Sequence, residues 1–458
     1  MPVDLNCKKT GLDEGKNFAL KFPVLGAAGL KSKLILDTRN YFISKIIPGV
    51  MGLLTVMVFV RLVGYEQYGR YAVLVALVTA CATAASGWLN QGILRFHSQH
   101  VGTQKELSFR RGSRLGTLLS ALLGSVVVGA IVWRGVARSV LVATAGLTLF
   151  VPMLIYSVEL TRLQASLRSG LVVRVESVRA ISSFVLPVVL IFVMRTKSYL
   201  LLLGGVGIGH FIPLLMMQKS RIETNAADKG AVGVFQETEH YELRRIWTYG
   251  WPVALWLACQ SCLVVSDRYV IQRYCGYSDA GVYASIYDVI VRSFSLVFAP
   301  ITLSIHSVLM HRWNRGDRCR TKQTLRKAMM YEWFLFFPVP IGLFFTNAWL
   351  AHLILGRANL EAARAILPLA LGGFLWQFAL LAHKPLEILC RTKRMLLGIT
   401  AALALNVTGN FILVPRFGLV ASAYLSAATA CLYLLLLAVL TPTNDFLAAS
   451  SETGPYTS

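Results

Sequence analysis

The feature that most constrains this chain is a series of long apolar runs. A bilayer core is about 30 Å thick, so a helix of about 20 mostly apolar residues can cross it. We count twelve such runs in the 458 residues. They are rich in Leu, Val, Ala and Gly and lack the alternation of barrel strands. The sequence therefore predicts an all-α polytopic membrane protein with about twelve transmembrane helices.

Composition agrees with this class, because charged residues make up only 15% of the chain, against about 25% in soluble domains. The predicted spans are residues 41–62, 70–95, 114–133, 138–157, 171–194, 199–217, 247–273, 280–310, 326–346, 365–390, 395–414 and 417–440. They divide the chain into an N-terminal extension (1–40), a six-helix lobe (41–217), a linker (218–246), a second six-helix lobe (247–440) and a tail (441–458).

One short segment occurs twice. RLVGYEQYGRYA, at Arg61 to Ala72, returns as RYCGYSDAGVYA, at Arg273 to Ala284, with six of twelve positions identical. The copies follow the first and the seventh span, so they are six helices apart, and an even number gives both halves the same orientation in the membrane. An alternative is that Gly-Tyr and Gly-x-Tyr are generic turn and interface residues. We favour an internal duplication that relates the two lobes as a parallel repeat.

The loops after the second and eighth spans are basic, which predicts that they are cytoplasmic. They contain Lys105, Arg110, Arg111 and Arg114, and Arg312, Arg315, Arg318, Arg320, Lys322, Arg326 and Lys327. Both termini then lie in the cytoplasm, and both copies of the repeated segment lie outside. Basic loops beside anionic headgroups also explain much of the net charge of +23, so we expect no nucleic-acid partner.

Motifs for nucleotide hydrolysis and for metal binding are absent from the sequence. There is no G-x-x-x-x-G-K-[ST] loop, no H-E-x-x-H and no paired Cys/His cluster. The C-x-x-C of Cys259 and Cys262 lies inside the seventh span, where packing of small residues is favoured over redox chemistry. We therefore expect no cofactor, no metal and no enzymatic activity.

Ionisable residues inside the spans are the candidate functional residues. Inserting one at the centre of a lipid-facing helix costs about 2.5 to 3.5 kcal/mol of free energy. We predict that Arg292, Asp288, Asp267, Arg268 and Arg95 bind substrate. Asp288 and Arg292 are four residues apart, hence on one face of the eighth helix. The alternative is that these two charges neutralise each other and that terminal charges, such as that of Arg95, extend to the interface.

Ion coupling is predicted at Asp288, Asp267 or Glu387. Glu387 lies in the tenth span, four residues after His383 and three after Lys384. No residue pattern identifies the ion.

Three passages resemble the polysaccharide transporter family. They are KIIPGVMGLLTVMVFVRLVGYEQYGRYAVLVALV, YGWPVALWLACQSCLVVSDRYVIQRYCGYSDAGVYASIYDVI and LNVTGNFILVPRFGLVASAYLSAATA. The shared features are the Gly-x-x-x-Tyr-Gly turn, the Asp-Arg pair, the Gly-x-Tyr after it, and Asn406, Asn410, Pro415, Phe417 and Gly418. The family includes Wzx-type O-antigen flippases, in a superfamily with multidrug extruders and the lipid II flippase. The resemblance runs from about Tyr41 to Leu440.

This resemblance implies twelve helices in two lobes around a central cavity, in the bacterial cytoplasmic (inner) membrane. The implied substrate is an oligosaccharide linked through pyrophosphate to a polyprenyl lipid, for O-antigen, capsule or exopolysaccharide synthesis. A polysaccharide polymerase and a chain-length regulator are the implied partners. The rivals are a multidrug antiporter of the same superfamily, a lipid II flippase, which usually has two further helices, and a membrane glycosyltransferase or polymerase, which usually has a large catalytic outer loop.

Overall fold

The computed structural model describes residues 27–100, 106–136, 138–166, 168–226, 236–314, 316–356, 359–389 and 391–441. These ranges contain fourteen helices and no strand. The helices are α1 (Ala27–Val63), α2 (Tyr65–His100), α3 (Glu106–Gly135), α4 (Val140–Ala165), α5 (Ser169–Met194), α6 (Tyr199–Ala226), α7 (Gln236–Cys275), α8 (Tyr277–Asn314), α9 (Arg318–Phe336), α10 (Pro338–Leu355), α11 (Leu360–Ala382), α12 (Lys384–Ile388), α13 (Thr392–Phe417) and α14 (Leu419–Leu440).

The prediction of twelve spans is confirmed, since twelve helical segments of the described residues are long and apolar enough to cross a membrane. Two of them are broken. The ninth span consists of α9 and α10, and the tenth of α11 and α12. Pro338 and Pro385 lie in the first turns of α10 and α12. Proline lacks the backbone N–H, so each of these residues removes one hydrogen bond that a continuous helix would make, which accounts for both breaks.

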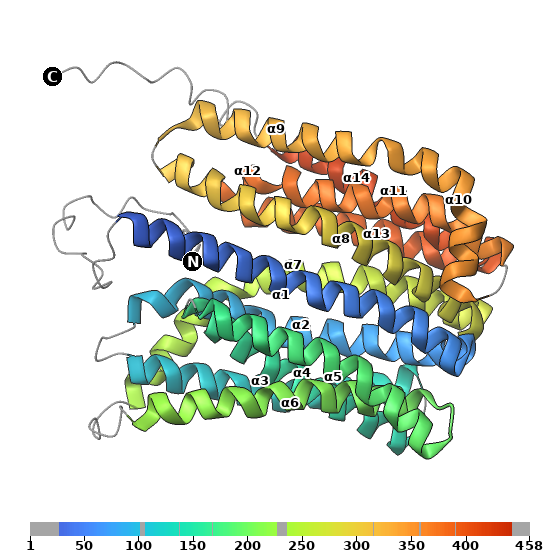
Figure 1. Cartoon of the computed structure of the whole chain (residues 1–458), viewed down its shortest axis with the longest axis horizontal. Helices are drawn as coiled ribbons and strands as arrows, with labels where there is room; N and C mark the ends of the chain where they lie inside the picture. Colours follow the sequence, from blue (N-terminus) through green and yellow to red (C-terminus); the bar gives the residue numbers. More distant parts are fainter. Residues whose placement is uncertain are drawn as a thin grey trace, which may run out of the picture.

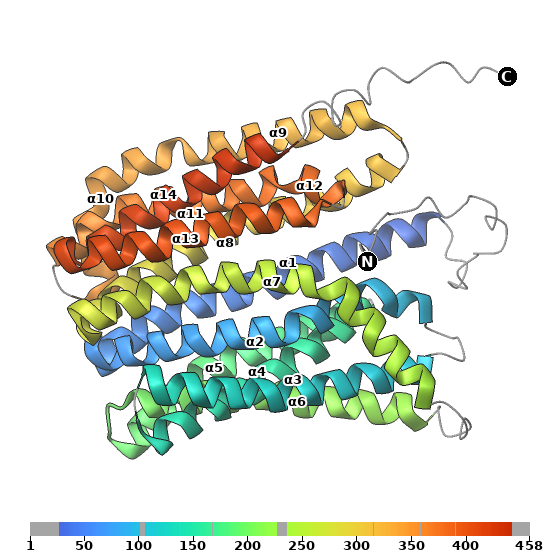
Figure 2. The ribbon, with the colours of Figure 1, turned by 180° about the vertical axis from the view of Figure 1, so that it is seen from behind.

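The helices form two bundles side by side (Figure 1). Helices α1 to α6 make one lobe and α8 to α14 most of the other, while α7 runs along the seam and packs on α2 (Figure 2). The turns that carry the repeated segments lie together at one end of the molecule, here named the repeat end (Figure 1). An all-α, two-lobe membrane fold is therefore confirmed.

Three helices, α1, α6 and α7, continue past the predicted bounds of the lobes, and those bounds stay a prediction. Helix covers residues 218–226 and 236–246 of the predicted linker, and α1 begins inside the predicted extension. The start of α7 is helical because it packs on α2: Ile246 is fully buried, and Glu242 lies 3.3 Å from His100 Nε2. Residues 1–26 and 442–458, the rest of the predicted extension and tail, lie outside the described residues.

The fourth position of each copy of the repeated segment is a glycine that turns the chain from one span to the next. Gly64 and Gly276 have φ angles of +83° and +92°. This left-handed conformation is unfavourable for a side chain with a Cβ atom, so glycine is required after α1 and after α7. Their N–H groups close the preceding helices by donating to Val60 O and Gln272 O.

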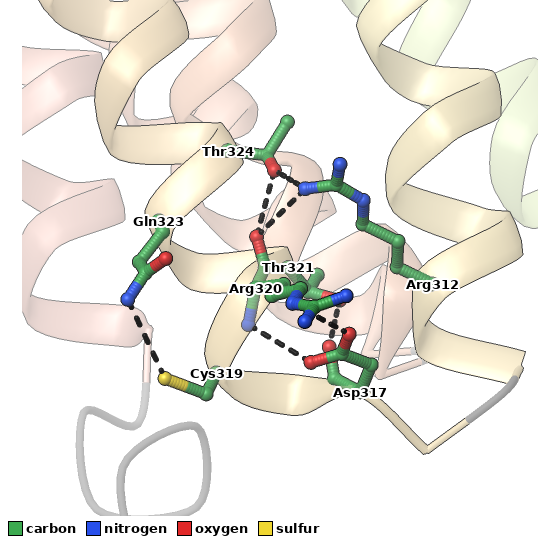
Figure 3. A network of polar contacts seen from close by, with 7 residues as sticks. All are labelled: Arg312, Asp317, Cys319, Arg320, Thr321, Gln323 and Thr324. Atoms are coloured by element: carbon green, nitrogen blue, oxygen red, sulfur yellow. Dashed lines mark hydrogen bonds and ion pairs between the residues drawn. The ribbon is translucent and has the colours of Figure 1, made fainter.

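The basic turn between α8 and α9 is ordered by its own polar groups (Figure 3). Asp317 caps α9 by accepting a hydrogen bond of 3.1 Å from Arg320 N. Arg312 donates to Thr324 Oγ1 and, at 3.3 Å, to Arg320 O. Asp317 is therefore used as a helix cap, and the exposed face of this turn stays basic.

Candidate functional site

The two copies of the repeated segment contact each other across the lobes. Gly69 in α2 and Gly281 in α8 occupy the same position of the repeat. A Cβ atom added to Gly69 would overlap Tyr277 O and lie 2.9 Å from Gly281 N. A Cβ atom added to Gly281 would overlap Tyr65 O and lie 2.9 Å from Gly69 N. The backbones of α2 and α8 thus touch at these glycines, around an approximate two-fold axis.

The repeated tyrosines also reach across the seam. Tyr65 Oη donates to Leu355 O at 2.9 Å, and Tyr277 Oη donates to Val136 O at 3.5 Å. Leu355 ends α10 and Val136 follows α3, so each tyrosine caps the third span of the opposite lobe. The last carbonyl groups of a helix have no partner inside it, which makes them natural acceptors. Tyr65, Gly69, Tyr277 and Gly281 are together called the repeat latch.

Arg268 joins the two lobes just below the latch. Its Nη2 lies 2.5 Å from Asp288 Oδ1, and its Nη1 donates to Ala72 O at 3.2 Å. Only 4% of Arg268 is exposed. The alternative in which Asp288 neutralises Arg292 is therefore wrong, because the aspartate pairs with the arginine of the neighbouring helix α7. Arg268 is held by these contacts within the lobe seam.

Arg292 is placed differently. It is exposed, and its guanidinium lies against Gly52 of α1, at a position that a Cβ atom on Gly52 would occupy. One turn further along α8, Leu296 contacts Gly49 in the same way. Within the described part of the chain, Arg292 takes part in no hydrogen bond or ion pair. The crossing of α1 and α8 therefore presents a guanidinium whose donors are open to a ligand.

Asp267 lies in a closed polar pocket of the second lobe, and 2% of it is exposed. Its Oδ1 accepts hydrogen bonds from Asn406 Nδ2 at 3.0 Å and Asn410 Nδ2 at 2.8 Å. Its Oδ2 accepts from Tyr283 Oη at 2.7 Å and Ser426 Oγ at 3.0 Å. All four donors are neutral. The hydrogen bonds stabilise the carboxylate, but none of these groups compensates its charge.

Sequence reasoning missed most of this pocket. Asn406 and Asn410 were part of the family resemblance and Tyr283 was part of the repeated segment, but no role followed for them, and Ser426 carried no signal of its own. The usable signal was the four-residue spacing of the two asparagines, which places both amides on one face of α13.

Arg95 and Glu387 lie away from this centre, towards the end opposite the repeat end. Arg95 is exposed, with its guanidinium carbon 5.8 Å from the centre of the Tyr249 ring. Glu387 accepts a hydrogen bond of 2.7 Å from Lys384 Nζ and lies 3.0 Å from His383 Nε2. The structure therefore groups Asp267, Arg268, Asp288 and Arg292 on α7 and α8, and separates the other two predicted residues from them.

The sequence matches no protein-family model, and no curated protein matches it. Several solved structures share its fold. An inward-facing multidrug resistance MATE family transporter of the MOP superfamily gives a TM-score of 0.67 at 11% identity, over 90% of this chain and 99% of that one. The lipid II flippase MurJ, in an inward closed conformation, gives 0.66 at 16% identity, over 91% and 90%. The chain has the fold of these transporters.

A third similar structure is a MOP superfamily transporter from Pyrococcus furiosus, whose description ascribes to it a binding pocket of reverse polarity and a different function. It has a TM-score of 0.64 and 12% identity, over 92% of this chain and 95% of that one. Neighbours with one fold are thus described as acting on different substrates, so function has to be argued from the site.

Proposed function

We propose that this protein is a flippase that moves polyprenyl-pyrophosphate-linked oligosaccharides across the cytoplasmic (inner) membrane for surface polysaccharide synthesis. The observation that carries the proposal is Arg292, an exposed guanidinium inside a span, at a contact between the two lobes. A pyrophosphate supplies the anionic oxygens that its forked donors fit. The polyprenyl chain stays in the bilayer while the headgroup crosses.

The sign of the charge favours this substrate over a cationic drug. A pocket for cations needs a carboxylate that is open to the ligand. Here Asp288 pairs with Arg268, Asp267 is enclosed by four donors, and Glu387 is held by Lys384. The predicted intramembrane carboxylates are thus occupied, whereas Arg292 is not. The MATE neighbours make a multidrug antiporter the second candidate.

Alternating exposure fits the two-lobe arrangement. The repeat latch holds α2 and α8 together at the repeat end, and in the proposed orientation this end faces outward while both termini are cytoplasmic. Outward release then requires the latch to part. Arg268 and Asp288, first predicted to bind substrate, are better placed to hold the lobes together in this state.

Asp267 is the proposed coupling residue. An ionised carboxylate surrounded only by neutral groups is costly to bury, so binding a proton there is favourable. The adjacent Arg268 bonds to the other lobe through Ala72 O. If ion binding moves α7, the hydrogen bond between Arg268 and Ala72 O at the lobe seam therefore changes with it.

The test is a gene deletion combined with reconstitution. Deletion should confine the lipid-linked repeat unit to the cytoplasmic leaflet and abolish surface polysaccharide, and the purified protein should translocate a labelled polyprenyl-pyrophosphate oligosaccharide in proteoliposomes. A polysaccharide polymerase and a chain-length regulator are the proposed protein partners of the flippase. If a deletion strain without a second flippase keeps its polysaccharide but becomes sensitive to cationic drugs, the antiporter replaces the flippase.

A further inference from the structure

A groove follows the seam between α2 and α7, and no step of the proposed transport uses it. It encloses about 220 Å³ and is lined by apolar side chains, among them Ala84 and Trp88 of α2 and Trp247, Trp251 and Ala258 of α7. The indole of Trp88 is satisfied by a hydrogen bond of 3.2 Å to Ser120 Oγ. Small side chains hollow the groove, and large aromatic ones form its wall.

The groove lies on a face of α7 that neither lobe covers. Arg244, Trp247, Trp251 and Ala258 follow the three- and four-residue spacing of one helix face. Trp247 and Trp251 are 52% and 42% exposed. The neighbouring face of α7 packs on α2, where Ile246 is fully buried. Figure 2 shows α7 and α2 side by side on this side of the molecule.

The floor of the groove is the contact between the lobes. A Cβ atom added to Gly87 of α2 would lie 3.2 Å from Ala254 Cβ of α7, and one added to Gly250 would overlap Trp88 O. Whatever fills the groove therefore touches both lobes at once, at the place where the helices cross most closely.

We propose that this groove holds an acyl chain of an anionic phospholipid, with the headgroup beside Arg244. An apolar hollow of this kind is a poor site for water, because it offers no partners for hydrogen bonds, whereas a hydrocarbon chain gains by filling it. Arg244 is exposed and lies one turn before Trp247, near the start of the seventh span at His240. A cation at that depth attracts an anionic headgroup, and tryptophan is favoured at the same depth.

Quenching of tryptophan fluorescence by brominated lipids tests the proposal without reference to transport. The full chain is reconstituted in phosphatidylcholine vesicles that contain a small fraction of phosphatidylglycerol brominated on its acyl chains. The signal of Trp247 and Trp251 is obtained by subtracting that of the Trp247→Phe/Trp251→Phe variant. Brominated phosphatidylcholine at the same fraction gives the baseline for an uncharged headgroup.

We expect the brominated phosphatidylglycerol to be enriched in the groove about fivefold over its share of the bilayer. This is the enrichment that the attraction between one cation and an anionic headgroup produces. Arg244→Gln should return the quenching to the phosphatidylcholine baseline. Lys393 is an exposed cation at the start of α13, and Lys393→Gln should leave the quenching unchanged. Ala258→Phe should fill the groove and reduce quenching by both lipids. Ala404→Phe, on an exposed face of α13, is its matched control.

Three results would overturn the proposal. The first is equal quenching by the two brominated lipids in the wild-type protein. The second is preferential quenching that survives Arg244→Gln. The third is loss of the quenching when unbrominated undecaprenyl phosphate is added at the same fraction, which would assign the groove to an isoprenoid carrier instead. Loss of quenching with Ala258→Phe but not with Ala404→Phe would support the groove as the site.

Discussion

Replacing Gly69 by alanine places a methyl group where α2 crosses α8. In the closed arrangement that methyl would overlap Tyr277 O and lie 2.9 Å from Gly281 N, whereas ordinary contacts begin at 3.4 Å. Both neighbours are backbone atoms, so no flexible side chain can move aside. The lobes have to separate at the repeat end, and Gly281→Ala should act in the same way through Tyr65 O and Gly69 N.

The size of the effect follows from the cost of overpacking. Inserting a methyl group into a well-packed contact costs about 1 to 3 kcal/mol. A cost of this size, applied to one state only, changes the ratio of closed to open protein by about 5- to 150-fold. Because the contact here is backbone to backbone, we expect Gly69→Ala and Gly281→Ala to lie towards the upper end of that range.

Spin labels at the repeat end measure the population directly. Lys197 and Arg416 are exposed, follow α5 and end α13 respectively, and belong to different lobes. In a cysteine-free background, distances between labels at these two positions should shift from the closed to the open population in either glycine variant. Gly129→Ala is the control, because nothing lies within 4 Å of a Cβ atom added there.

If Gly69→Ala keeps the wild-type distance distribution while its thermal stability matches that of Gly129→Ala, the contact at the glycines does not determine the closure of the repeat end.

Three further predictions concern single side chains. Arg292→Ala should lower transport in proteoliposomes about 10- to 100-fold, because a hydrogen bond to a charged group contributes about 1.5 to 3 kcal/mol. Arg292→Lys should restore only part of the transport, because lysine lacks the paired donors of the guanidinium. Transport at the wild-type rate by Arg292→Ala would show that this residue has only a structural role. Asp267→Asn should remove the response of transport to an imposed proton or sodium gradient, and a variant that keeps this response would show that coupling lies elsewhere. Tyr65→Phe should weaken closure of the repeat end by about 0.5 to 1.5 kcal/mol. Tyr277→Phe should weaken it by less, since the hydrogen bond of Tyr277 is 3.5 Å long. A larger open population with Tyr277→Phe than with Tyr65→Phe, measured with the spin labels, would contradict this prediction.

The number and lengths of the spans could be predicted because the bilayer imposes one length scale on every apolar run. The two lobes could be predicted because the repeated segment recurs after six helices. The start of α7 could not, since residues 236–246 are polar in sequence and become helical by packing on α2. The prolines at positions 338 and 385 indicate the two helix breaks in the sequence. Each break was nevertheless missed, because each proline lies within or beside an apolar run long enough to count as one span.

The pairing of charges was the least predictable part of the site. Asp288 and Arg292 share a helix face by spacing alone, but the rotation of α7 against α8 decides that Asp288 meets Arg268. Likewise, Arg292 lies against Gly52, 240 positions earlier in the chain, and no local pattern records that distance. Periodicity identified which residues were unusual, and only tertiary packing determined their partners.

The approximate two-fold axis through the repeat latch also bears on why the two copies of the repeated segment are alike. Away from the axis, packing within a half, such as that of α5 on α6 or of α11 on α14, can change independently of the other half. At the axis, the neighbour of Gly69 is Gly281, and the neighbour of each copy is the other copy. A change in one copy there alters the surface that the second must fit. This mutual dependence gives a physical reason why RLVGYEQYGRYA and RYCGYSDAGVYA still share half of their residues.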